Sequence, residues 1–445
     1  MSSDDSIPKG STIASRGERL RASTRALRHR NFKLFFAGQL VSLIGTWMQT
    51  IAQAWLIYRL TDSAMLLGLV GFANQIPVFL SAPIGGVIAD RFSRRSILVA
   101  TQIASMLLAL ILAALTFSGT VEPWHILLLA AILGVVSGFD IPARQSFVVE
   151  MVGREDLSNA IALNSSMFNG ARLVGPAIAG LVVAALGEAW CFLLNGISYI
   201  AVIAGLLKMT IPARSALGYR GTPFADVLEG FRFSLTVRPV RALLLLLFVV
   251  SFAGMPYTIL MPIFADRIFG AGATGLGILM SSAGLGALAA SIVLAARPSV
   301  RGLGSWIAFS AAGVGISLVV FALSPFFWLS ASLLAAVGFF VMLEMASSNT
   351  LIQSMVPDAL RGRVMAVYSM MFMGGGPLGA LLAGSIAERA GAPAALIFGG
   401  VACICGGVVF RWRLPLLREE GIRLMTTQQM APGQPPDQVT GAGAP

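Results

Sequence analysis

The stretch Gly86-Val-Ile-Ala-Asp90-Arg91-Phe-Ser93-Arg94-Arg95 decides how the rest of this sequence is interpreted. It separates two apolar runs, Met65 to Ala89 and Ser96 to Phe117, each long enough to span a bilayer. Glycine lets helices approach closely, and an aspartate at a membrane edge accepts hydrogen bonds from arginine or from a helix N-terminus. Two interpretations are open here: a gate at the cytoplasmic end of the second span, or arginines that only anchor the loop on the inner side of the membrane.

The composition indicates that the chain lies in lipid. Of its 445 residues, 56% are hydrophobic and only 11% are charged, and the mean hydropathy is +0.82. A soluble domain carries about 25% charged residues. The composition also argues against an enzyme, since 2 His and 3 Cys without a CxxC pattern supply neither a metal cluster nor a disulfide framework. The sequence has no phosphate-binding loop and no Ser-His-acid set, so we expect no cofactor, no metal and no catalytic residue.

Apolar runs of about 20 residues, the length that crosses a bilayer core, occur twelve times. In the first half of the chain they are Phe32 to Tyr58, Met65 to Ala89, Ser96 to Phe117, Trp124 to about Phe147, Ala160 to Leu186, and Trp190 to Met209. In the second half they are Ala242 to Ala265, Gly272 to Ala296, Leu303 to Leu323, Phe326 to about Ser347, Val364 to Ala387, and Pro393 to Trp412.

The positive charge is segregated by membrane side. The net charge of +11 would also suit a nucleic-acid-binding protein, but 27 of the 31 Lys and Arg residues fall on the side that we predict to be cytoplasmic. Arg59, Arg267 and Arg389 fall on the other side, and Arg172 lies within a span. Because loops rich in Lys and Arg stay inside, we predict that both termini are cytoplasmic and that nucleic acid is not a partner.

Two sets of six spans divide the chain. We expect a cytoplasmic N-terminal segment (1–31), a first six-helix half (32–209), a cytoplasmic linker (210–241), a second six-helix half (242–413) and a disordered cytoplasmic tail (414–445). Helical spacing of apolar residues in the linker predicts a short helix at the membrane surface. These residues are Phe224, Val227, Leu228, Phe231 and Leu235. Repetition between the halves, at an offset of 204 residues, places Asp140 on Glu344.

The stretch quoted first resembles the signature loop of the major facilitator superfamily, G-x-x-x-D-R-x-G-R-R, which joins spans two and three. Gly86, Asp90, Arg91, Arg94 and Arg95 match, and Ser93 stands where the second Gly is usual. The resemblance implies an all-α membrane protein of twelve transmembrane helices, in two pseudo-symmetric six-helix halves around a central cavity. It also implies that the matching residues, called the gate motif below, hold the halves together on the cytoplasmic side in the outward-facing state.

Span five contains a second motif, Gly175-Pro176-Ala-Ile-Ala-Gly180. It resembles the G-P-x-x-G-G motif of the proton antiporter branches of the superfamily, with Gly180 displaced by one residue, and the resemblance implies export. Small residues and proline also account for a kinked, closely packed helix without any such role. Packing therefore stays open as the alternative for this motif.

Ionisable residues inside spans are few, and each costs about 2.5 to 3.5 kcal/mol on insertion scales. They are Asp140 with the nearby Arg144 in span four, Arg172 in span five and Glu344 in span ten. The resemblance implies that spans one, four, seven and ten line the cavity, so that Asp140 and Glu344 face each other across it. Proton or cation coupling, an ion pair such as Asp140 with Arg144, and contact with the substrate all stay open. Arg172 could pair with either acid or bind an anionic substrate.

Aromatic and amide side chains within the spans are candidates for the lining of a substrate cavity. Scarce fixed charge suits a bulky, partly apolar ligand, and interhelical hydrogen bonds are the competing interpretation. The candidates are Trp47, Gln49 and Gln53 in span one, Asn164 in span five and Asn195 in span six.

Three segments look most like the branch of the superfamily that contains the enterobactin and macrolide exporters of bacteria, of the drug:H+ antiporter type. They are Leu27 to Phe35, Asp140 to Gln145 and Asn169 to Gly180. The resemblance implies a multi-pass secondary transporter of the bacterial inner membrane that exports a bulky amphipathic small molecule by proton-coupled alternating access. Its partners would be that substrate, protons and the lipid bilayer, and we expect a monomer. A lysophospholipid or metabolite carrier of the same fold, and a non-transporting sensor or scaffold, are the alternatives.

Overall fold

The computed structural model describes residues 24–153, 155–210, 223–297 and 302–429, apart from the side chains of 223–227, 359 and 425–429. Every regular element in this part of the chain is a helix. Twelve helical stretches are long and apolar enough to cross a bilayer, which confirms the predicted number. A short helix, η1 (Arg25–Arg28), precedes the first six spans, which are α2 (Arg30–Thr61), α3 (Ala64–Arg91), α4 (Arg94–Phe117), α5 (Pro123–Val152), α6 (Leu157–Leu186) and α7 (Glu188–Leu207).

The other six spans follow a linker helix, α8 (Pro223–Thr236). Span seven is built from four consecutive pieces: α9 (Arg238–Val249), η2 (Val250–Gly254), α10 (Tyr257–Ile263) and η3 (Phe264–Ile268). The last five are α11 (Gly272–Ala295), α12 (Leu303–Leu323), α13 (Phe327–Met355), α14 (Asp358–Ala390) and α15 (Ala392–Gln429).

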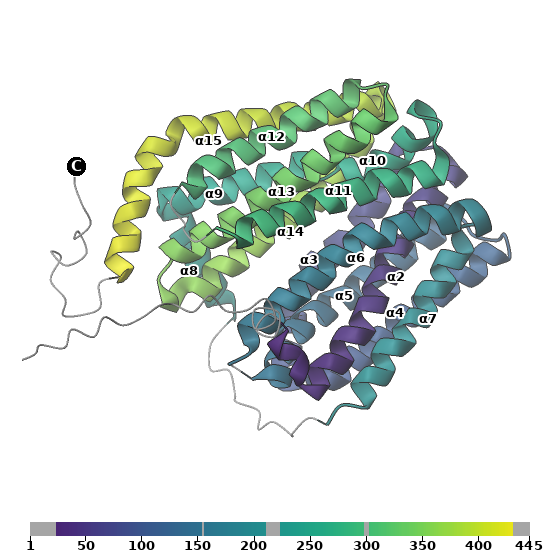
Figure 1. Cartoon of the computed structure of the whole chain (residues 1–445), viewed down its shortest axis with the longest axis horizontal. Coiled ribbons are helices and arrows are strands. Elements are labelled where there is room, and N and C mark those ends of the chain that lie inside the picture. Colours follow the sequence, from purple (N-terminus) through teal and green to yellow (C-terminus); the bar gives the residue numbers. More distant parts are fainter. Residues whose placement is uncertain (1–23, 154, 211–222, 298–301, 430–445) are drawn as a thin grey trace, which may run out of the picture.

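The spans form two bundles, α2 to α7 and α9 to α15 (Figure 1). In the first bundle α3 packs along α5, and α7 packs along α2 and α4. In the second, α12 packs along α15, and α13 packs along α11 and α12. The bundles meet mainly through two helix pairs, α6 with α11 and α3 with α14. The predicted fold of two six-helix halves is thus confirmed.

Consecutive spans run in opposite directions, so their connections alternate between two ends of the molecule. The terminal end carries residues 92–93 and 356–357, together with η1 and α8. The opposite end carries residues 62–63, 269–271 and 324–326.

Span seven departs from a regular α-helix. Pro256 has no backbone N–H and Pro262 lies inside α10, and a π-helical stretch lies on each side of α10. In the first of these, the Met255 N–H donates to the Val250 carbonyl at 3.0 Å, five residues back. Such π turns recur at functional positions in helices. Here the turn and Pro256 set the position of Tyr257, the first residue of α10.

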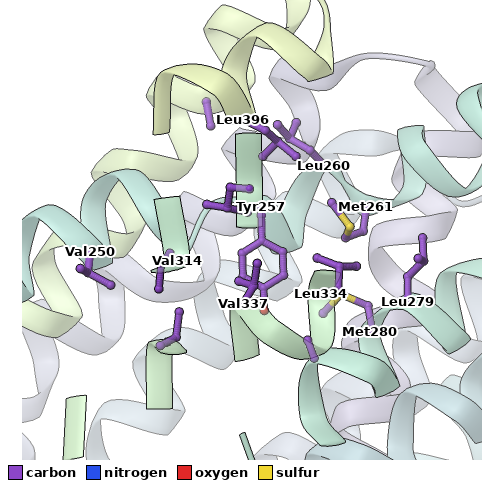
Figure 2. Close-up of a cluster of buried hydrophobic side chains, with 14 of the residues drawn as sticks. Val250, Tyr257, Leu260, Met261, Leu279, Met280, Val314, Leu334, Val337 and Leu396 are labelled. Carbon is purple, nitrogen blue, oxygen red and sulfur yellow. The ribbon is translucent and has the colours of Figure 1, made fainter. Parts of the chain in front are cut away.

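Tyr257 lies in the largest apolar core of the protein. Figure 2 shows its ring beside Val337 and Leu334 of α13, with Met261 of α10 and, further away, Leu279 of α11 in the same cluster. All five side chains are at most 1% exposed. In lipid, close packing of this kind is what holds helices together, because the surrounding acyl chains are as apolar as the core itself.

Two segments near the predicted domain boundaries, residues 223–236 and 414–429, are helical. Helix α8 lies in the linker. Its Leu228 and Leu235 side chains are exposed, and Phe231 packs against the core. The side chains of Phe224 and Val227 lie outside the described part.

The prediction of disorder from residue 414 is wrong for 414–429, since α15 stays helical to Gln429. Helix formers on both sides of Pro415 continue the helix, and Figure 1 shows its last turns bending away from the bundle. Residues 430–445 lie outside the described part.

Candidate functional site

The gate motif lies at the terminal end, where α3 ends and α4 begins. Arg94 donates hydrogen bonds to the Ser146 carbonyl at 3.2 Å and to Glu150 at 2.8 Å, and it lies 3.5 Å from Asp90. Arg95 donates to the Leu207 carbonyl at 2.7 Å. These contacts tie α3 and α4 to α5 and α7, all within the first half.

The gate motif makes no described contact with the second half, although the resemblance implies that it binds there in the outward-facing state. Asp90 and Arg91 are exposed, and a Cβ placed on Gly86 would meet no atom within 4 Å. The described hydrogen bonds and ion pairs of Asp90, Arg94 and Arg95 reach no residue of the second half. In this conformation the motif therefore holds together the first half alone.

The hydrogen bonds and ion pairs that join the halves in the described part of the chain lie at the opposite end. Asp62 forms an ion pair with Arg267, and the Tyr58 hydroxyl donates to Asp266 at 3.0 Å. Glu388 accepts from the Ser63 hydroxyl at 3.1 Å and from the Met65 N–H at 3.0 Å. The opposite-end cluster, as we call this set, comprises Tyr58, Asp62, Ser63, Met65, Asp266, Arg267 and Glu388.

Sequence reasoning missed the opposite-end cluster. Three of its members, Asp62, Asp266 and Glu388, are acids next to the few arginines on the predicted outer side. That proximity of opposite charges in short loops was the available signal. Asp62 also has a left-handed backbone, with φ of 54°, as the residue that ends α2. This conformation is unusual for a residue other than glycine.

The span-five motif packs α6 against two other helices. A Cβ on Gly175 would lie 2.5 Å from the Cβ of Trp47 in α2, and one on Gly180 would lie 2.9 Å from the Ala273 carbonyl oxygen in α11. The Pro176 carbonyl oxygen faces Gly277 of α11. Positions 175 and 180 have no room for a side chain, so the packing alternative accounts for the two glycines of the motif.

Asp140 lies inside the first half and is 4% exposed. Its carboxylate accepts hydrogen bonds from Thr101 and Gln102 of α4, each at 2.9 Å, and forms an ion pair with Arg144 one turn further along α5. The intramembrane charge is thus paired and fully hydrogen-bonded within one half. This is the arrangement that makes a buried charge tolerable.

Glu344 lies inside the second half and is fully buried. One carboxylate oxygen accepts from the Ser348 hydroxyl at 2.9 Å, and the other has no hydrogen-bond partner in the described part of the protein. The expectation that Asp140 and Glu344 face each other is wrong, because their described contacts stay within separate bundles. The sequence repeat aligns Asp140 with Glu344, but each side chain is buried inside its own six-helix bundle.

Arg172 lies between the halves and pairs with neither acid. Its guanidinium carbon is 5.7 Å from the centre of the Trp47 ring, and Trp47 makes an edge contact with Phe168 at 5.7 Å between ring centres. From the second half, the phenol of Tyr257 comes within electrostatic reach of this guanidinium. Arg172, Trp47, Phe168 and Tyr257 are called the interface group below.

The amide side chains that were candidates for the cavity differ in their surroundings. Asn195 of α7 donates to Gln49 of α2 at 2.7 Å, and both side chains are buried, so this pair is an interhelical hydrogen bond. Gln53 is buried as well, whereas Asn164 is half-buried near the terminal end of α6. Of the predicted cavity residues, Trp47 is the one that the structure brings into the interface group.

A further cluster at the terminal end was not predicted. The Asp156 carboxylate, 1% exposed, forms ion pairs with Arg25, with Arg28 at 2.8 Å and with His29 at 2.7 Å. Asn159 accepts from the Ala26 N–H at 2.8 Å. The hydrogen bond from His29, followed by Arg25 and Arg28, lowers the pKa of Asp156 to about 2. The cluster ties η1 to the start of α6.

The arrangement of the helices defines the class of the protein. A solved structure of the nucleoside transporter NupG superimposes on this chain with a TM-score of 0.67 at 14% identity, covering 87% of this chain and 99% of that one. Twelve spans in two halves, with the gate motif between spans two and three, are the architecture of a major facilitator superfamily transporter.

The chain belongs to the transmembrane secretion effector family, whose model matches residues 22–436. It is 28% identical over 385 residues to the staphyloferrin A transporter of Staphylococcus aureus, covering 85% of this chain and 95% of that protein. It is 28% identical over 393 residues to the multidrug efflux pump Tap of Mycolicibacterium fortuitum (84% and 93% covered). It is 26% identical over 367 residues to the enterobactin exporter EntS of Shigella boydii (80% and 85%). These relatives confirm the predicted branch, and the chain is a membrane transporter rather than an enzyme.

Proposed function

We propose that this chain is an exporter of the bacterial inner membrane that works by alternating access between its two halves. The observation that carries the proposal is the uneven distribution of contacts: the opposite-end cluster joins the halves, while the gate motif contacts the first half alone. A protein closed at one end and unlatched at the other corresponds to one of the two states of such a cycle. Opening the closed end requires that the opposite-end cluster separate.

The terminal end is the cytoplasmic end in this proposal. Most Lys and Arg residues lie in the segments that this end carries, and loops rich in these residues stay inside. The conformation described is then inward-facing. In the outward-facing state Asp90 would turn to the second half, which its exposed position permits.

Coupling to protons falls to Glu344 rather than to Asp140. Asp140 already has Arg144 beside it, so its charge is balanced without a proton. Glu344 is fully buried, has a carboxylate oxygen without a partner, and has no basic residue among its described contacts. A bare carboxylate in this place is costly. A carboxyl that gains and loses a proton as the surrounding helices move provides the coupling that an antiporter needs.

The substrate is an amphipathic small molecule in this proposal. The relatives are named for a siderophore or for several drugs, and the interface group is aromatic with a single fixed charge. One chain contains both halves and the interface group, so we propose that the monomer is the working unit.

Transport by purified protein in liposomes tests this function. Ethidium and erythromycin serve as test compounds, and an acidic lumen supplies the proton gradient. We expect accumulation that an uncoupler abolishes. Glu344→Gln should lose accumulation, and Glu419→Gln, the same change at an exposed position of α15, should keep it.

Three results would contradict parts of the proposal. Accumulation that survives the uncoupler would exclude proton coupling, and wild-type accumulation by Glu344→Gln would exclude Glu344 as the coupling residue. Failure of both compounds, which are cations at neutral pH, to move under any gradient would argue against export of amphipathic cations.

A further inference from the structure

Arg172 is a charged residue at the junction of the halves that alternating access alone does not explain. It lies midway along α6, where this helix touches α11: a Cβ on Gly284 of α11 would lie 2.8 Å from the Arg172 carbonyl oxygen. The side chain is half-buried, with its guanidinium 5.7 Å from the Trp47 ring centre. An arginine at this depth is expensive unless it faces a partner or a ligand.

No carboxylate partners Arg172 within the described residues. The two acids inside the spans are held elsewhere, Asp140 by Arg144 and Glu344 by Ser348. The acids of the opposite-end cluster contact Arg267, Tyr58 and Ser63 instead. The positive charge between the halves therefore has no fixed counter-charge.

The groups around Arg172 fit an anion attached to a flat apolar body. The Tyr257 hydroxyl is buried, makes no hydrogen bond of normal geometry among the described residues, and comes within electrostatic reach of the guanidinium. A carboxylate beside Arg172 could accept from this hydroxyl and from the guanidinium together. The Trp47 ring lies beside the Arg172 guanidinium and makes an edge contact with the 47% exposed Phe168, and aromatic surfaces of this kind pack well against planar ligands.

We propose that Arg172 is the anion-binding residue of the substrate site and that the substrates are amphipathic organic carboxylates. This inference rests on the proposed function and names its substrate class. Arg172 belongs to the first half and Tyr257 to the second, so a bound carboxylate would bridge the halves directly. A neutral molecule of the same shape would leave the guanidinium without its counter-charge.

Binding of a matched acid and amide tests the proposal. The full chain is placed in lipid nanodiscs, and calorimetry compares naphthoate with naphthamide, with empty nanodiscs subtracted. We expect the wild type to bind the acid at least about tenfold more tightly than the amide, the difference that a charge-assisted hydrogen bond supplies. Arg172→Gln should abolish the preference, and Arg172→Lys should keep part of it.

The control variant is Arg389→Gln, which removes the same charge from an exposed position at the opposite end and should keep the full preference. A wild type without preference for the acid, whether it binds both compounds or neither, would overturn the proposal. So would a preference that persists in Arg172→Gln. The wild-type comparison needs no variant, so it stands even if Arg172→Gln does not fold.

The outcomes also separate this inference from the proposed function. Arg172-dependent preference for the acid, together with no gradient-driven transport of any compound, would support the anion site and contradict the exporter. Gradient-driven transport of ethidium and erythromycin that Arg172→Gln leaves unchanged, together with no preference for naphthoate, would support the exporter and overturn the anion site.

Discussion

Single residues in this protein show how a carboxylate is made tolerable where water is scarce. Asp140 has a basic partner one helical turn away and two further donors. Asp156 has three basic partners at the terminal end. Glu344 has a single hydroxyl. The first two carboxylates are balanced by basic partners, and the third has no basic residue among its described contacts.

Asp156 gives a prediction about pH. Its pKa is lowered from 3.8 to about 2, so its ionised form stabilises the fold above about pH 4, and that contribution disappears as the pH falls through about 2. We expect Asp156→Asn to lower the melting temperature at pH 7, with the difference from wild type shrinking between pH 4 and pH 2. Scanning fluorimetry in detergent measures this. Asp358→Asn, an exposed acid beside Arg361, should change little, and a difference that persists at pH 2 would refute the assignment.

The buried Asn195 and Gln49 pair gives a second prediction. Asn195→Leu leaves the Gln49 amide buried without its partner, which costs about 1–3 kcal/mol. Replacing both by leucine removes the orphaned group, so the double variant should be more stable than Asn195→Leu alone. Unfolding of the single and double variants measures the difference. Additive losses would mean that the two amides do not depend on each other.

Among the helices, their number was predictable and their ends were not. Hydropathy marks the lipid-facing length, yet α5 continues to Val152, past the charged Glu150, and α13 continues through polar residues to Met355, because backbone hydrogen bonds do not stop at the edge of the apolar run. The same reason explains the helix through residues 414–429. The π-helical stretches of span seven leave no periodic signal, so they could not be read from the sequence.

Close approach of α6 and α11 gives a prediction at this scale. A Cβ on Gly277 would lie 2.6 Å from the Pro176 carbonyl oxygen, so Gly277→Ala must push the helices apart and should cost about 1–3 kcal/mol. Gly170→Ala in α6, where a Cβ meets nothing within 4 Å, is the matched control and should be neutral. Thermal unfolding compares them. Equal stability of the two variants would contradict the packing role of this crossing.

Across the whole molecule, the sequence predicts the two halves and the gate motif but not where the halves touch. Asp62 and Arg267 belong to different halves, and no spacing rule links such distant residues. Repetition pairs Asp140 with Glu344, but it does not give the direction in which each side chain points, so the prediction that they face each other is wrong. Arg172 could be named from its charge alone, whereas its aromatic surroundings come from three helices that only the fold brings together.

The opposite-end cluster is the place to test alternating access. With Cys405, the exposed cysteine of the described part, replaced by serine, Asp62→Cys and Arg267→Cys place two thiols where the ion pair now joins the halves. Transport in liposomes is then measured before oxidation, after oxidation and after reduction. The account predicts that the disulfide stops transport by keeping the opposite end closed and that reduction restores it. Transport at an undiminished rate with the disulfide fully formed would contradict the account.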